Sequence, residues 1–269
     1  MMRSYLTMQN KLISILQRGK GLLLRKRTIN LIVGFIVALA LVISGFVSLV
    51  KDDAVESKNE FQALVEEARR SSCFSVEMVP KFDGEGTVLV NGDIPFFDET
   101  DLSKEPFQQF DPLDSLGRCG RAEACIDKSM MPTEPRGEIG MIKPSGWQIS
   151  KYPFVDGKYL YNRCHLIGYQ LTGENANEKN LITGTRYLNT EGMLPLENEV
   201  ADYIEKTNTR VLYRVTPVFD GSDLVACGVL MEAFSVEDGG QGICFCRFCY
   251  NVQPGVDIDY SNGNNQETN

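Results

Sequence analysis

Short apolar runs separated by turn residues fill the chain from Phe74 onward. Most are rich in β-branched and aromatic residues, and this composition predicts strands. The predicted strands are 159–162, 165–171, 181–188, 210–219, 224–236 and 242–252. Asn91-Gly92, within the apolar stretch 88–97, predicts a hairpin turn between two further strands.

One segment has helical periodicity instead. Residues 191–206 contain good helix formers, and Pro195 is compatible with a helix only in its first turn. Apolar residues recur on one face at helical spacing. These residues are Leu196, Val200, Tyr203 and Ile204. Strands clustered around one clear helix favour an α+β fold with an antiparallel sheet.

Polar segments set the predicted domain boundaries. Residues 51–72 are helix formers with few breakers and predict a stalk, and residues 73–260 predict one folded domain. Within that domain, residues 111–147 are rich in turn formers and are expected to be irregular. The polar end, residues 261–269, is expected to be a disordered tail.

A stretch of twenty uncharged residues, 31–50, precedes the stalk. About twenty apolar residues in a helix span a bilayer core of about 30 Å. The stretch is longer than the apolar part of a typical signal peptide and lacks a small-residue cleavage pattern, so it predicts a transmembrane helix. A cleaved signal peptide is the alternative. Both interpretations export the residues that follow.

Charge is divided unevenly along the chain. Residues 1–50 hold seven of the 27 basic side chains and none of the 36 acidic ones, which leaves the remainder with a net charge of −16. The positive-inside rule therefore predicts that residues 1–30 form a basic cytoplasmic segment and that residues 51–269 lie outside. Five basic residues are expected to form a local positive groove in this acidic part. They are Lys151, Lys158, Arg163, Lys179 and Arg186.

All eight cysteines follow the apolar stretch. An even number of cysteines in an exported domain favours disulfides, and Cys119 and Cys125 flank a short loop that they could close. The cluster Cys244, Cys246 and Cys249 could instead form a thiolate metal site. No spare histidine or paired CxxC motif completes a tetrahedral set, which weighs against that alternative.

The chain has one histidine, His165. A lone histidine is more often a packing residue than a catalytic one. Arg163 lies two positions earlier, so on a strand both side chains share a face. Guanidinium groups bind phosphate, and a nearby positive charge favours the neutral imidazole that a general base requires. Asn180 and Asn189 follow, and amide oxygens are ligands suited to Mg²⁺.

Three segments carry a family resemblance: NRCHLIGYQL (162–171), NLITGTRYLN (180–189) and GMLPLENEV (192–200). Together with LGRCGRA, MPTEPRGEIGMIKPSGWQ and YNVQPGVDIDY, they resemble the DNA/RNA non-specific endonuclease family. The resemblance is to the bacterial branch that includes streptodornase and the DNA-entry nucleases. It runs from about Phe74 to Tyr260.

The resemblance implies a ββα-metal nuclease fold with a central antiparallel sheet flanked by helices. It also implies Mg²⁺-dependent cleavage of phosphodiesters, with Mn²⁺ or another divalent cation as a substitute. The implied roles are general base for His165, phosphate contact for Arg163 and Arg136, direct metal ligand for Asn189, auxiliary active-site amide for Asn180 and water-holding acid for Glu197.

The chain departs from the family pattern at three positions. Asn162 stands where the motif has an aspartate, which removes a charge near the metal. Cys164 replaces a glycine and could be disulfide-bonded. Ala201 stands where the family often has an arginine, and Arg186 could supply that charge at the phosphate site.

The expected function is therefore that of a magnesium-dependent endonuclease acting on DNA outside the cytoplasm. The sequence leaves open whether RNA is a second substrate. The chain would be held to the membrane by residues 31–50, with no protein partner. The alternative is a disulfide-stapled extracellular module that binds nucleic acid or another polymer without catalysis, in which case the three departures would mark lost chemistry.

Overall fold

The computed structural model describes residues 60, 63, 74–102 and 105–268. The expected basic segment 1–30, the expected membrane helix 31–50 and nearly all of the expected stalk 51–72 lie outside these residues. Within the described part of the chain, no helix is both long and apolar enough to cross a bilayer.

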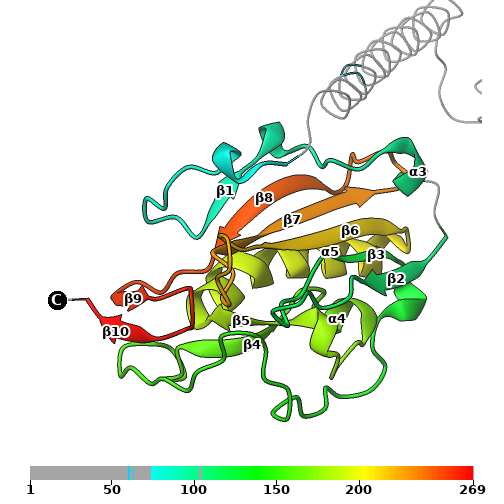
Figure 1. The fold of residues 1–269 in the computed structure, drawn as a ribbon. Coiled ribbons are helices and arrows are strands. Elements are labelled where there is room, and N and C mark those ends of the chain that lie inside the picture. Colours follow the sequence, from blue (N-terminus) through cyan, green and yellow to red (C-terminus); the bar gives the residue numbers. More distant parts are fainter. Residues whose placement is uncertain (1–59, 61–62, 64–73, 103–104, 269) are drawn as a thin grey trace, which may run out of the picture. The chain divides into compact units, whose positions relative to one another are not determined.

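The largest element is a six-stranded sheet in which all neighbouring strands are antiparallel (Figure 1). Its central strands come from the predicted runs near the C-terminal end, where alternate side chains face the two sides of the sheet. In spatial order the strands are β1 (Thr87–Leu89), β8 (Cys244–Tyr250), β7 (Gly228–Ser235), β6 (Val211–Val218), β3 (Ala122–Ile126) and β2 (Phe107–Phe110).

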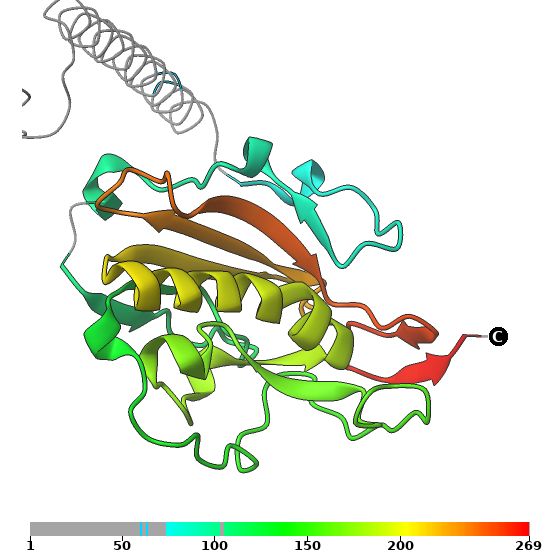
Figure 2. The same ribbon diagram turned by 180° about the vertical axis from the view of Figure 1, so that it is seen from behind.

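Helix α5 (Leu194–Thr207) covers one face of this sheet, and a two-stranded hairpin lies on the other side of the helix (Figure 2). The hairpin pairs β4 (Tyr161–His165) with β5 (Leu181–Thr185). The predicted helix is therefore confirmed, with Pro195 in its first turn and Asn208 ending it in a left-handed conformation. This β4–β5–α5 unit presents the predicted site residues.

Short elements complete the described fold. The C-terminal residues form a second hairpin, β9 with β10. The short elements, including the two strands of this hairpin, are η1 (Val76–Met78), η2 (Asn91–Asp93), α3 (Glu99–Leu102), η3 (Lys128–Met130), α4 (Tyr169–Thr172), η4 (Glu178–Asn180), η5 (Leu188–Met193), β9 (Val256–Ile258) and β10 (Asn265–Glu267).

The main core lies between the sheet and α5. Leu196, Val200 and Ile204 of the helix are at most 4% exposed and pack against inward residues of β3, β6, β7 and β8. The same cluster includes Leu166 and Ile182, which fix the hairpin to the helix. A separate apolar cluster lies on the opposite face of the sheet, where residues 74–96 cover β7 and β8.

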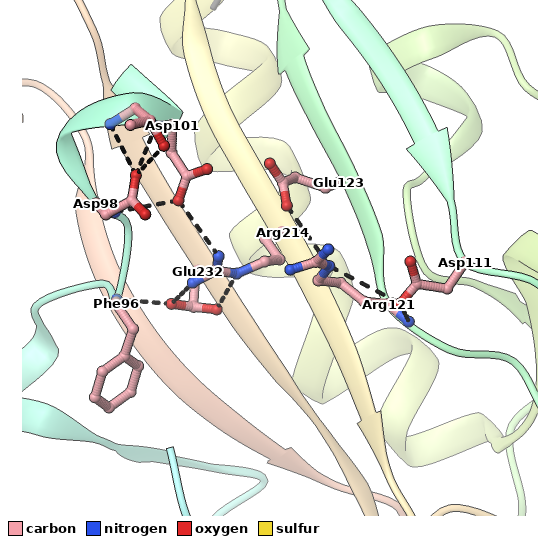
Figure 3. A network of polar contacts seen from close by, with 9 residues as sticks. Phe96, Asp98, Asp101, Asp111, Arg121, Glu123, Arg214 and Glu232 are labelled. Atoms are coloured by element: carbon pink, nitrogen blue, oxygen red, sulfur yellow. Dashed lines mark hydrogen bonds and ion pairs between the residues drawn. The ribbon is translucent and has the colours of Figure 1, made fainter. Parts of the chain in front are cut away.

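A row of charged side chains crosses that opposite face (Figure 3). Glu123, Arg214 and Glu232 are cross-strand neighbours on β3, β6 and β7, and all three are buried. Arg214 donates two hydrogen bonds to Glu232, at 2.7 and 2.8 Å, and its guanidinium stacks on Phe97. Glu232 also accepts from the backbone of Phe96. The pair thus anchors the covering segment to the sheet.

Four expectations about local structure are wrong. Asn91-Gly92 forms a tight turn, but β1 pairs with β8 rather than with the next segment, because Asp93 binds the backbone of Cys246 and the side chain of Arg247. Residues 111–147 include strand β3. The run 165–171 leaves the strand after His165 and forms α4.

The fourth correction concerns the expected disordered tail, 261–269. Residues 265–267 form β10 and pair with β9 in register. The polar side chains stabilise this hairpin instead of leaving it solvated. Asn262 donates to Asp259, and Asn265 bonds both Tyr152 and Ser150.

The disulfide expectation is also wrong for the cysteines whose state is described. Cys119 is a free thiol that donates to the carbonyls of Glu178 and Leu181, so no Cys119–Cys125 crosslink forms. The reason is geometric: Cys119 packs on the helix side of the sheet with Ala124, whereas Cys125 follows Ala124 and points to the other face.

The thiolate site fails for the same reason. Cys246 belongs to the outer apolar cluster and Cys249 to the main core, on opposite faces of β8. Among the described residues, no three cysteine, histidine or carboxylate side chains converge so that they could hold a metal ion.

The Arg214–Glu232 pair makes a stability prediction. Replacing Arg214 by Met should leave Glu232 as a buried, unpaired charge and lower the free energy of unfolding by about 3–5 kcal/mol. The exposed Asp202–Lys206 pair is the matched control, and Lys206→Met should change it by less than about 1 kcal/mol. Urea denaturation measures both. Equal effects of the two substitutions would contradict the anchoring role.

Candidate active site

His165 ends strand β4, and its imidazole is only 6% exposed. Nε2 lies 2.8 Å from the carbonyl oxygen of Asn175, and Nδ1 lies 3.1 Å from Nη2 of Arg136. A carbonyl can only accept a hydrogen bond and a guanidinium can only donate one. The ring is therefore the neutral tautomer with its proton on Nε2, and Nδ1 carries the free lone pair.

Burial lowers the pKa of His165 to about 4. The hydrogen bond to the Asn175 carbonyl opposes this shift, and the positive charge of Arg136 adds to it. The imidazole is therefore uncharged at neutral pH, as expected, but the causes are burial and Arg136 rather than Arg163. It does not open directly into the pocket described below, because Arg136 covers Nδ1.

Arg136 also lines a pocket of about 510 Å³. Asn189, Arg163 and Arg186, three of the predicted site residues, line it as well, together with Asn162. All charged side chains that line this pocket are arginines, so it is locally positive although the chain is acidic. Of the five basic residues expected to form a positive groove, only Arg163 and Arg186 line this pocket, and Lys151, Lys158 and Lys179 do not.

Asn189 lies in η5, a π-helical turn that leads directly into α5. Such turns are uncommon and often occur at functional sites. The turn places Asn189 half-buried in the pocket, and no described residue bonds its side-chain amide. Its amide oxygen, a hard ligand, is available to a divalent cation.

Asn162 gives a second sign that the pocket is built to receive a polar group. Its Nδ2 atom is buried and has no hydrogen-bond partner among the described residues. A buried unpaired donor is unfavourable, and a water molecule or a phosphate oxygen would satisfy it. The pocket thus fits a hydrated cation with its anionic substrate, even without the charge that an aspartate would add.

Arg163 and Arg186 lie in the pocket but are partly engaged. Arg163 donates to the carbonyls of Ile142 and Gly140, and its guanidinium stacks on Trp147 with 4.0 Å between the guanidinium carbon and the ring centroid. Arg186 donates to the exposed Asp156. Arg163 therefore holds the wall of the pocket. Arg186 brings a positive charge to the pocket lining, whereas Ala201 lies in the main core.

Asn180 does not reach the pocket. It is fully buried, with Oδ1 accepting from the backbone N–H of Ile167 and Nδ2 donating to the Ile167 carbonyl. Both ends of the amide are thus used to fix the chain just after His165. Asn180 therefore positions the backbone next to His165 and does not line the pocket.

Glu197 lies on the first turn of α5, buried against Gly168, where a Cβ would come 2.6 Å from its Oε2 atom. Burial raises the pKa of Glu197 to about 7, while a hydrogen bond with Gln170 and the charge of Arg136 oppose the shift. Arg136 therefore acts electrostatically on both His165 and Glu197.

Cys164, next to the base, is a free and fully buried thiol, so the expected disulfide at this position is absent. Its sulfur occupies the space above Gly184, where any Cβ would overlap it. Three supporting groups escaped sequence reasoning: the Asn175 carbonyl, Gly168 and Trp147. Only Trp147, the single tryptophan, stood out in the composition.

Comparison with known proteins agrees with this geometry. The model of the DNA/RNA non-specific endonuclease family matches residues 101–236, just over half of the chain and all of the predicted site. The chain belongs to this family. It is a metal-dependent endonuclease that hydrolyses phosphodiester bonds, which decides against a purely non-catalytic binding module.

Solved structures share the fold. NucA from Streptococcus agalactiae with magnesium bound is 24% identical, with a TM-score of 0.62, over 78% of this chain and 96% of that one. The Sda1 nuclease with bound zinc is 29% identical, with a TM-score of 0.51, over 60% and 81%. These neighbours confirm the branch to which the motifs pointed. Among curated proteins, none matches the chain.

The single histidine allows a direct test of its environment. In NMR, the His165 Cε1–H resonance should titrate with a midpoint near pH 4 rather than the usual value of about 6.5. Between these values the unfolded chain binds a proton that the folded chain does not, so the free energy of unfolding should fall as the pH drops through this window. Arg136→Gln should raise the midpoint only partly, because burial is the larger cause. A midpoint of 6 or above in the unsubstituted protein would disprove the buried, neutral ring.

Proposed function

We propose that the chain is a Mg²⁺-dependent, non-specific endonuclease of DNA, and also of RNA, in which His165 is the general base. The observation that carries this proposal is the tautomer of His165. Nε2–H is donated to a backbone carbonyl, so Nδ1 is the ring nitrogen that can take up a proton. Among the described residues Nδ1 is hydrogen-bonded to Arg136, which lines the pocket.

Arg136 accounts for how the base becomes available. A guanidinium binds a phosphate more strongly than a neutral imidazole, because the bond to phosphate joins two opposite charges. A scissile phosphate entering the pocket would draw Arg136 toward itself and release Nδ1. His165 then takes a proton from the water molecule that attacks phosphorus in line with the leaving 3′ oxygen, and the product carries a 5′-phosphate.

The remaining residues bind and orient the substrate. Asn189 would hold the cation through its amide oxygen, and the cation would supply positive charge beside the phosphate. Arg136 and Arg186 neutralise the other phosphate oxygens. Glu197, with a pKa near neutrality, orders water molecules near the cation. Mn²⁺ is expected to substitute for Mg²⁺. Magnesium in NucA and zinc in Sda1 support a divalent cation here.

The setting of the reaction is part of the proposal. Residues 31–50 anchor the protein, and the nuclease domain, which includes the β9–β10 hairpin beyond residue 260, lies outside the cytoplasm. No partner protein is required. The charge asymmetry of the sequence supports this orientation.

Replacement of His165 tests the catalytic assignment. His165→Ala should reduce cleavage of plasmid DNA and of single-stranded RNA at least about 100-fold, because positioned proton transfer contributes about 10²–10⁴-fold. EDTA should abolish the activity of the unsubstituted protein, and Mg²⁺ or Mn²⁺ should restore it. A folded His165→Ala protein, checked by circular dichroism, that cleaves at the normal rate would refute the proposal.

Asn189 tests the metal assignment separately. Asn189→Ala should raise the Mg²⁺ concentration needed for half-maximal cleavage and lower the affinity for Mn²⁺ measured by electron paramagnetic resonance. Asn264→Ala is the matched control, because Asn264 is an exposed asparagine on the β9–β10 hairpin, away from the pocket. An unchanged metal affinity in Asn189→Ala would remove this residue from the site.

A further inference from the structure

The pocket has an apolar wall that the proposed catalytic steps do not use. The wall comes from residues 147–161, which contribute Trp147, Ile149, Tyr159 and Tyr161 to the lining. It lies in the same pocket as Asn189 and Arg136. A substrate whose phosphate meets those two residues would therefore extend its neighbouring groups along this wall.

Only part of the wall is available to a ligand. Trp147 is covered by the Arg163 guanidinium, and Tyr161 is 4% exposed with its hydroxyl donated to the Gly263 carbonyl. Tyr159 is 49% exposed and Ile149 is 75% exposed. A single exposed apolar residue is ordinary, but here an aromatic and an aliphatic side chain share a pocket whose charges are all positive.

The backbone that carries Tyr159 is held in place before any ligand arrives. Lys151 and Tyr159 form a β-bridge, and Leu160 N–H donates to the Ser150 carbonyl. Behind this segment the C-terminal hairpin provides support, because Tyr152 donates to Asn265 and Tyr161 to Gly263. A side chain on an ordered backbone loses less conformational entropy when a planar group stacks on it than one on a mobile backbone.

We propose that Tyr159, with Ile149 beside it, forms a stacking subsite for one unpaired nucleobase next to the scissile phosphate. This inference rests on the proposed function. Aromatic stacking tolerates every base, since each has a π-face, and so suits a nuclease without sequence preference. The Lys151 ammonium lies over one face of the Tyr159 ring, 4.4 Å from its centroid, so the base would stack on the other face. The ammonium adds a positive charge for a flanking phosphate.

The subsite has a consequence for substrate choice. A base inside a duplex is stacked between its neighbours and cannot lie flat on Tyr159 without unpairing. Unpairing and unstacking a base cost free energy, which a single strand does not require. The enzyme is therefore expected to have a lower KM for single-stranded than for duplex DNA, and Tyr159 is the residue that produces the difference.

The test uses single-stranded oligonucleotides with one cleavable linkage, the others being nuclease-resistant. Tyr159→Ala should raise KM about tenfold with little change in kcat, since stacking on an aromatic side chain is worth roughly that factor or more. Tyr159→Phe should retain the normal KM. Phe154→Ala is the matched control, an aromatic residue of the same segment that is 50% exposed but does not line the pocket.

An abasic site beside the cleavable linkage distinguishes stacking from general damage. It should raise KM for the unsubstituted enzyme but have little further effect on Tyr159→Ala, because the two changes remove the same contact. Equal abasic effects in both proteins, or equal KM changes in Tyr159→Ala and Phe154→Ala, would overturn the subsite. Binding of a labelled strand to His165→Ala protein in Mg²⁺, followed by anisotropy, gives the same comparison without cleavage, so failure of the proposed catalysis is seen separately.

Discussion

Two buried asparagine amides hold the β4–β5 hairpin in place, and the site depends on that hairpin. Two strands outside the main sheet leave backbone groups that must be satisfied elsewhere. Asn251, just after β8, accepts from Thr185 N–H and donates to the carbonyls of Thr183 and Ala226, which ties β5 to the large sheet. Asn180, just before β5, bonds both backbone groups of Ile167 and so ties the chain after His165 to the start of β5. Each amide makes hydrogen bonds that a neighbouring strand would otherwise make, and together the two amides fix the position of the imidazole.

The electrostatics of the site follow from this rigidity. A fixed carbonyl from Asn175 and a fixed ring allow one tautomer, and burial keeps that ring uncharged. All charged side chains that line the pocket are arginines. The acidic residues of the described part of the chain lie outside this lining, and several of them pair with arginines, as in the Arg214–Glu232 pair. An acidic protein can therefore bind a polyanion through a small positive pocket, with long-range repulsion reduced by salt.

The sequence was most informative where a local pattern and a tertiary role coincide. The strand runs and the helical periodicity of α5 are visible in the sequence because burial of one face imposes them. The spacing from His165 to Asn189 and Glu197 is informative because β4, β5 and α5 are contiguous in the chain. Contacts made by backbone atoms, such as the Asn175 carbonyl, leave no side-chain signal. The prediction of a Cys119–Cys125 disulfide failed because the two thiols lie on opposite faces of the sheet. The face that each thiol takes depends on where β3 begins, which the sequence pattern did not show. The asparagine-rich end resembled a solvated tail because composition does not reveal that Asn262 bonds Asp259 and that Asn265 bonds Tyr152 and Ser150.

The contact between Cys164 and Gly184 makes these two positions an epistatic pair. The sulfur fills the space that a side chain on the neighbouring strand would need. Loss of the sulfur alone would open a void next to the imidazole, and growth of Gly184 alone would push the strand that bears the base. A larger side chain at position 184 is tolerated only when the side chain at position 164 becomes smaller. The residue before the histidine is therefore set by packing across the hairpin.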